Sequence, residues 1–257
     1  MSIVASNLSL HISGFDLLRN IDLTIEAGKV NVLVGPNGAG KSSLLRVLTG
    51  EIKPSNGNVL INQHKLNHWS IQDIANILAV LPQHSELNFP FTAAEVVGLG
   101  RIPHKTGFAK DQTIIEEALA LVDASYLQRR LYTQMSGGEK QRVQLARVLA
   151  QIWKPSKLGD QFLVLDEPTA AFDLSHQQLT LSIVRQLADR GVGVLMVLHD
   201  LNLAARCADN LVVVNGGTIE ASGSPDEVLT KELIYKVFDV QSVIAEHPIA
   251  KTPLVIT

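Results

Sequence analysis

The chain has 257 residues, of which 46% are hydrophobic and 18% are charged, and its formal net charge is −3. This length allows one large α/β domain or two small ones with a substantial core, and the slightly acidic balance argues against a nucleic-acid binder. A single cysteine, Cys207, excludes a disulfide framework. The first ten residues lack the basic segment and the long apolar segment of a signal peptide, so we expect none.

The mean hydropathy is +0.17, although every apolar run is short. A membrane-spanning helix needs about 20 apolar residues. The runs here, at 30–34, 162–165, 192–198 and 211–214, consist of β-branched residues, leucine and a few others. Such runs are typical of parallel strands covered on both faces. The composition therefore predicts an α/β protein with a buried parallel sheet.

The first half of the chain begins with short predicted strands and turns, including one at 17–25. A helix is expected over 42–49, and Ser70 with Asp73 predicts another helix start. The segment from about 83 to 150 has few β-branched runs, and we interpret it as a helical insertion. Within it, Thr113 and Glu116 have the spacing of a capping box and predict a helix beginning there.

In the second half, a similar pattern at Ser175 predicts a helix between the strands at 162–165 and 192–198. The segment 211–221 predicts a hairpin that turns at Asn215-Gly216-Gly217. Ser224 followed by Pro225 opens one more helix, because proline suits the first helical position.

Residues 35–42 form a complete G-x-x-x-x-G-K-[ST] motif between a predicted strand and a predicted helix. The glycines let successive amides point at phosphate oxygens, and the helix N-terminus adds a positive dipole end. Lys41 can reach the β- and γ-phosphates, and the Ser42 hydroxyl can bind Mg²⁺. The motif predicts a nucleoside triphosphate site. Its candidate residues are Gly35, Pro36, Asn37, Gly38, Ala39, Gly40, Lys41, Ser42 and Ser43.

The apolar run at 162–165 ends in two acids, Asp166 and Glu167. Neighbouring side chains of a strand point to opposite faces, so the two acids are suited to different work. Asp166 is a candidate for the Mg²⁺ shell, and Glu167 is the candidate general base for the attacking water. Acids also occur at strand ends simply because the next loop is solvated. The phosphate loop favours the functional interpretation.

Ser136-Gly137-Gly138-Glu139 precedes a helical pattern at 140–151. Ser136 and Glu139 form a capping box, which is sufficient to begin a helix. The two glycines would also let a second phosphate approach the helix N-terminus. One nucleotide does not need two such helix ends from one chain, whereas two chains packed head to tail would each supply one.

The phosphate loop, the Ser-Gly-Gly-Glu segment and the Asp-Glu strand have the order and spacing of ATP-binding cassette (ABC) ATPases, which the whole chain resembles. The resemblance implies a P-loop NTPase (RecA-like) core with an antiparallel β subdomain over 1–82 and 151–257, and a helical subdomain over 83–150. It also implies a homodimer with two ATPs between the protomers. Each ATP would lie between one phosphate loop and the other protomer's Ser136, Gly137 and Gly138.

The same resemblance assigns three further residues. Gln83 would be the Q-loop glutamine, which couples Mg²⁺ and water to a partner. Asp173 would be the D-loop aspartate, and His199 would contact the γ-phosphate. The implied catalytic set is therefore Glu167, His199 and Gln83, and the implied Mg²⁺ ligands are Ser42, Gln83 and Asp166.

Four positions depart from the family pattern. Met135 and Phe172 each stand where leucine is usual, and Glu139 stands where glutamine is usual. The position of the aromatic residue that stacks on adenine holds Leu10 or His11. The nearest aromatic is Phe15, so the adenine-stacking residue stays open.

A single cassette with a short C-terminal extension and no membrane helices of its own resembles the ATPase subunit of a bacterial importer at the cytoplasmic face of the inner membrane. Several segments resemble the group that imports iron-siderophores, haem and cobalamin, and residues 144–153 are most similar to hemin importers. The implied partners are a permease dimer, with residues 89–91 as a contact, and indirectly a periplasmic binding protein. We expect no nucleic-acid partner and no haem bound to this subunit. A siderophore or cobalamin importer, or a non-transport cassette, is the alternative.

Overall fold

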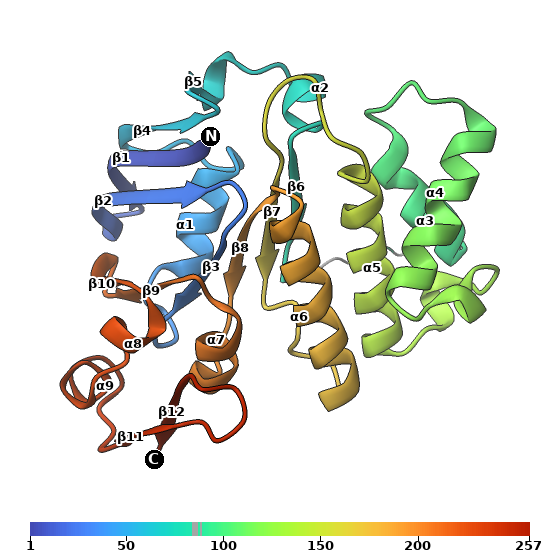
Figure 1. Cartoon of the computed structure of the whole chain (residues 1–257). Coiled ribbons are helices and arrows are strands. Elements are labelled where there is room, and N and C mark those ends of the chain that lie inside the picture. Colours follow the sequence, from blue (N-terminus) through green and yellow to red (C-terminus); the bar gives the residue numbers. More distant parts are fainter. Residues whose placement is uncertain (84–86, 88) are drawn as a thin grey trace.

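The computed structural model describes residues 1–83, 87 and 89–257. Figure 1 shows two sheets at the centre and one side of the molecule, with a group of helices at the other side. The predicted fold class, an α/β core with an antiparallel β part and an inserted helical part, is confirmed. Of the helical insertion expected at 83–150, residues 84–86 and 88 lie outside the described residues.

A six-stranded sheet forms the core, in the order β10-β9-β3-β8-β7-β6. All its neighbouring pairs are parallel except β9 and β10, which form the predicted hairpin. Successive residues of β3 enter different core clusters, with Val32 on one face of the sheet and Leu33 on the other. Both faces of the sheet are therefore covered. The strands are β3 (Val30–Val34), β6 (Leu78–Leu81), β7 (Phe162–Asp166), β8 (Gly193–Val197), β9 (Asn210–Asn215) and β10 (Thr218–Gly223).

The second sheet has the order β2-β1-β4-β5 and is antiparallel. Its strands are β1 (Ser2–Ile12), β2 (Phe15–Glu26), β4 (Asn56–Ile61) and β5 (His64–Lys65). The first two are long and form one hairpin, where the sequence predicted shorter strands. Helix α1 (Lys41–Leu48) shares a core cluster with both sheets, since Leu44 is buried together with Ile3 and Phe162.

The inserted helical part packs α3 and α4 against α5, and its core includes Val96, Ile115 and Leu145. The helix expected from Thr113 begins earlier, at Phe108. Gly107 occupies the N-cap position, and the Thr113 hydroxyl bonds to the Ala109 carbonyl inside the helix. Its elements are α3 (Ala93–Gly98), α4 (Phe108–Leu121), α5 (Gly137–Gln151) and 3-10 turns at Leu99–Arg101, Ser125–Leu127 and Tyr132–Gln134. A 3-10 turn at Leu66–His68 and α2 (Ile71–Ile74) precede this part in the chain.

The predicted helix at Ser175 is present, but it starts one residue earlier. Asp173 is its N-cap residue, because the Asp173 carboxylate accepts a hydrogen bond from the backbone N–H of His176. Among the described residues, no helix is both long enough and apolar enough to cross a bilayer. The remaining elements are α6 (Leu174–Asp189), α7 (Leu201–Cys207), α8 (Pro225–Val228), α9 (Lys231–Phe238), β11 (Val243–Glu246) and β12 (Pro253–Ile256).

Candidate active site

The loop at 35–40 connects β3 to α1 and is packed tightly between neighbouring strands. A Cβ atom on Gly35 would lie 2.0 Å from the carbonyl oxygen of Val214, and one on Gly40 would lie 2.8 Å from that of Leu17. Both glycines also have positive φ angles, 152° and 103°. Only glycine fits at these two positions, so the close packing of the loop explains this part of the motif.

Lys41 is buried at the start of α1, and its side chain folds back over the loop. Its Nζ donates hydrogen bonds to the carbonyl oxygens of Gly35 (2.7 Å) and Pro36 (2.8 Å). Burial lowers the pKa of Lys41, and the nearby carboxylates of Glu167 and Asp166 oppose that shift. The loop thus carries a partly desolvated positive charge facing two acids.

Asp166 is the last residue of β7 and is buried, with 8% of its surface exposed. Burial raises the pKa of this carboxyl group, and a hydrogen bond with the Ser42 side chain works against the rise. Its Oδ1 has no hydrogen-bond partner among the described residues. A buried carboxylate oxygen without a partner, beside a serine hydroxyl, is a suitable ligand set for a hard cation.

Glu167 follows directly and adopts a left-handed backbone conformation, with φ of 52°. Such a conformation is uncommon for a residue other than glycine and is found at functional sites. Its Oε1 lies 2.5 Å from Nε2 of His199, which follows β8. Gln141 of α5 donates to the carbonyl oxygens of Glu167 (3.4 Å) and Pro168 (3.2 Å). Gln141 was not predicted from the sequence as a site residue, although it lies one turn into the helix that Ser136 begins.

Gln83 lies two residues after Leu81 of β6, and it is exposed. Leu81 pairs with Leu165, the residue before Asp166. The structure therefore brings Gln83, the acid pair, His199 and the phosphate loop to the carboxyl edge of one parallel sheet, where ligands of open α/β sheets bind.

Ser136 does not lie at this edge of the sheet but at the N-terminus of α5. Its hydroxyl accepts from the Glu139 N–H (3.3 Å), and the Glu139 carboxylate accepts from the Ser136 N–H (2.7 Å), so the predicted capping box is confirmed. A Cβ atom on Gly137 would meet nothing within 4 Å. Figure 1 shows α5 and α1 on opposite sides of β7 and β8, so this helix end does not join the phosphate loop of its own chain.

The residues considered for adenine stacking lie near the end of the β1–β2 hairpin. Leu10 is buried in the sheet, so it is unavailable for stacking. His11 pairs with Asp16 (2.8 Å), and Phe15 is 71% exposed. Because Leu17 of the same hairpin contacts Gly40, Phe15 and His11 are both on a segment beside the phosphate loop.

This arrangement defines the chain as a P-loop nucleotide-binding protein with an inserted helical part, and comparisons with known proteins give the family. The family described as "ABC transporter" matches residues 18–170. The hemin import ATP-binding protein of Pseudomonas fluorescens is 48% identical over 97% of both chains, and that of Pseudomonas aeruginosa is 47% identical over 97% of both. A dimeric bacterial ABC transporter cassette has a similar fold, with a TM-score of 0.77 at 24% identity, covering 86% of this chain and 98% of that one.

The chain therefore belongs to the ABC transporter family. It is an ATPase of that family, the class to which its phosphate loop and acid pair point.

Proposed function

We propose that this chain is the ATP-hydrolysing subunit of a bacterial importer that takes up hemin through a membrane permease. The observation that carries the proposal is its identity of 48% over 97% of a hemin import ATP-binding protein. The gathering of phosphate loop, acid pair and histidine at one sheet edge supports the ATPase part of it.

In this proposal the loop at 35–42 binds the phosphates of ATP. Its amides and the N-terminus of α1 face the phosphate oxygens, and Lys41 exchanges its carbonyl partners for the β- and γ-phosphates. The remaining loop residues, Pro36, Asn37, Gly38, Ala39 and Ser43, shape this cradle. Phe15 or His11 would contact the adenine.

Mg²⁺ would be held by Ser42, Asp166 and Gln83, and the unpartnered Oδ1 of Asp166 supports this assignment. When bound, the ion neutralises charge on the β- and γ-phosphates. Glu167 then orients a water molecule and takes its proton as that water attacks the γ-phosphorus, and ADP leaves with the bond electrons. His199, at 2.5 Å from Glu167, holds the carboxylate in place and contacts the γ-phosphate.

Two copies of the chain would bind two ATPs head to tail. The open N-terminus of α5, with Ser136, Gly137 and Gly138, would face the partner's ATP, since it does not reach the phosphate loop of its own chain. Asp173 would lie at the same interface, because the start of α6 adjoins the start of α5. The dimeric ATP-binding cassette with ADP and phosphate, similar in fold at a TM-score of 0.76, supports this assembly.

Residues 83–150 would form a subdomain that passes nucleotide-driven motion to the permease, and 1–82 with 151–257 would form the nucleotide-binding part. Phe89 and Phe91 are 66% and 36% exposed, with ring centroids 6.1 Å apart. These two rings lie close together on the surface, and contiguous exposed apolar surface marks interaction sites, so these residues are the proposed contact for permease helices. The chain would then sit at the cytoplasmic face of the inner membrane.

The imported ligand would reach the permease from a periplasmic binding protein and would not touch this chain. Import of a ferric siderophore or of cobalamin is the alternative within the same group. Co-purification with the hemin permease tests the assembly. We expect a stable complex, which Phe89→Ser with Phe91→Ser weakens, and failure of the wild-type chain to bind that permease would contradict the proposal.

A further inference from the structure

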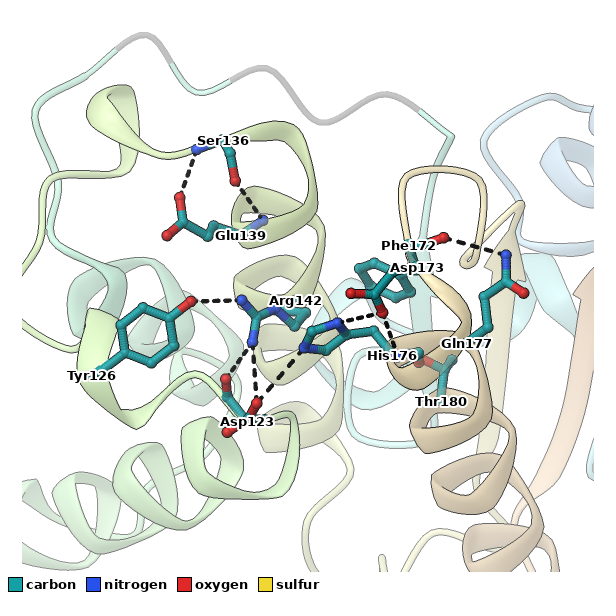
Figure 2. A network of polar contacts seen from close by, with 10 residues as sticks. All are labelled: Asp123, Tyr126, Ser136, Glu139, Arg142, Phe172, Asp173, His176, Gln177 and Thr180. Carbon is teal, nitrogen blue, oxygen red and sulfur yellow. Dashed lines mark hydrogen bonds and ion pairs between the residues drawn. The ribbon is translucent and has the colours of Figure 1, made fainter.

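His176, in the first turn of α6, contacts the helical part of the same chain. Nδ1 of His176 lies 2.8 Å from Oδ1 of Asp173, while Nε2 lies 3.6 Å from Oδ2 of Asp123 (Figure 2). Asp173 is the N-cap residue of α6, and Asp123 lies in the turn that follows α4. The imidazole therefore stands between two carboxylates from two parts of the fold.

Asp123 is in turn fixed to α5 by Arg142. Asp123 has a left-handed backbone with φ of 54°, and the Arg142 guanidinium donates to its carbonyl oxygen. The same guanidinium lies 3.7 Å from the Asp123 carboxylate and donates to the Tyr126 hydroxyl (2.7 Å). Because Arg142 is largely buried, it holds this turn firmly against the helix that Ser136 begins.

Two further contacts join the same parts of the chain. A Cβ atom on Gly138, beside Ser136, would lie only 3.1 Å from the carbonyl oxygen of Ala171. Gln141 donates to the carbonyl oxygens that precede this segment, at Glu167 and Pro168. The beginnings of α5 and α6, which carry Ser136 and Asp173, are therefore packed together within one protomer.

The hydrogen-bonding roles of the imidazole follow from its neighbours. Hydrogen bonds from the backbone and side chain of His176 lower the pKa of Asp173, so its carboxylate is ionised and only accepts. Nδ1 must then carry a proton. In the neutral ring Nε2 would turn a lone pair toward Asp123, whereas the imidazolium donates toward both carboxylates. The other groups at this position are the Arg142 cation, which binds Asp123, and the Phe172 ring, whose centroid is 6.1 Å from that of His176.

We propose that His176 is a positioning residue, which fixes Asp173 relative to Ser136 by joining the start of α6 to the Asp123–Arg142 pair. The proposal rests on the head-to-tail dimer of the proposed function, in which both Asp173 and Ser136 face the partner. A fixed spacing between them lets both engage the second protomer together. Loss of the imidazole or of the Asp123 carboxylate would loosen this spacing.

The test combines His176→Gln and Asp123→Asn, singly and together, with Asp189→Asn as a control. Glutamine removes the charge while keeping a good helix former, and asparagine tolerates the left-handed conformation at 123. Asp189 lies on the same helix, where it forms only an exposed pair with Arg185. ATPase kcat and KM are measured for each variant, and urea unfolding gives the free energy of unfolding of each.

We expect each variant to lower kcat by about threefold to tenfold, with KM for ATP unchanged, and we expect the double variant to lose no more kcat than the single variants. The control keeps wild-type kinetics. Additive losses of kcat, or a raised KM with kcat unchanged, would overturn the proposal.

The unfolding measurements separate this inference from the proposed function. Coupling between positions 123 and 176 in the free energy of unfolding supports the contact whether or not the protein hydrolyses ATP, and absence of coupling refutes it. A wild-type chain without ATPase activity would refute the proposed function instead.

Discussion

The imidazole of His199 and the carboxylate of Glu167 are joined by a 2.5 Å contact between the ends of two adjacent parallel strands, β8 and β7. Both strands are buried along their whole length, which places the backbones on either side of this contact. The pair lies within reach of the phosphate loop, since the Glu167 carboxylate is close to Lys41.

Replacing Glu167 by glutamine is expected to abolish turnover while ATP still binds. The substitution keeps the size of the side chain but removes the carboxylate base, which contributes about 10²- to 10⁴-fold to the rate. ATPase assays and equilibrium binding of a fluorescent ATP analogue measure the two effects. Hydrolysis within a few-fold of wild type would show that Glu167 is not the base.

Lys41→Ala is expected to weaken nucleotide binding itself. Its charged hydrogen bonds to phosphate are worth about 1.5–3 kcal/mol, which corresponds to a loss of affinity of at least tenfold. Lys29→Ala is the matched control, because Lys29 lies in an exposed pair with Glu26 just before the strand that leads to the loop. Unchanged affinity in the Lys41 variant would remove this residue from the site.

Ser136→Arg should block ATP-dependent dimerisation without preventing nucleotide binding to the monomer. An arginine would fill the open space at the start of α5 that the partner's ATP is proposed to enter. Ser136→Ala separates this effect from loss of the helix cap, which costs about 1 kcal/mol of stability. Light scattering of the Glu167→Gln background with ATP measures dimerisation. A Ser136→Arg protein that dimerises normally argues against the head-to-tail interface.

Stability in acid is expected to depend on Glu139. A hydrogen bond from the Ser136 N–H holds the pKa of Glu139 below its usual value. The contribution of the ionised Glu139 carboxylate to the free energy of unfolding is therefore fully present above the unfolded-state pKa of 4.5. It is lost as the pH falls through the lower folded-state pKa. Glutamine keeps the capping interaction at every pH. Urea unfolding from pH 3 to 7 should show a smaller acid loss in Glu139→Gln, and identical pH profiles would contradict this.

Cys207 is expected to be unreactive in the folded protein. Burial raises the pKa of its thiol to about 12, so almost no thiolate is present at pH 8. A thiol-specific reagent should label the native chain slowly and the urea-unfolded chain quickly. Rapid labelling of the native chain would show that the thiol is accessible.

A structural feature could be predicted from the sequence where residues close to one another in the chain determine it. The glycine-rich loop between β3 and α1 and the capping box at Ser136 were predicted correctly, because each is determined by neighbouring residues. The capping-box spacing of Thr113 and Glu116 gave a wrong prediction of a helix start, because Thr113 lies inside a helix that begins at Phe108. At α6, the carboxylate of Asp173 provides the cap instead of Ser175.

Contacts between distant segments could not be predicted from the sequence. The hydrogen bonds of Gln141 to the Glu167 segment depend on how α5 packs against the core sheet, where it contacts β6, and nothing in the local sequences specifies that packing. The contact of His176 with Asp123 arises in the same way from the packing of α6 against the helical part. The function of an exposed side chain such as Phe15 could not be predicted either, because exposure by itself specifies no partner.

Uptake of hemin into proteoliposomes that contain the permease is the most direct test of the central claim. With the wild-type chain and ATP, and with the matching binding protein supplying the ligand, hemin should accumulate, and ferric siderophore and cobalamin should not. Glu167→Gln should assemble with the permease but transport nothing. Accumulation of a siderophore or cobalamin in place of hemin, or hemin uptake undiminished by Glu167→Gln, would contradict the account.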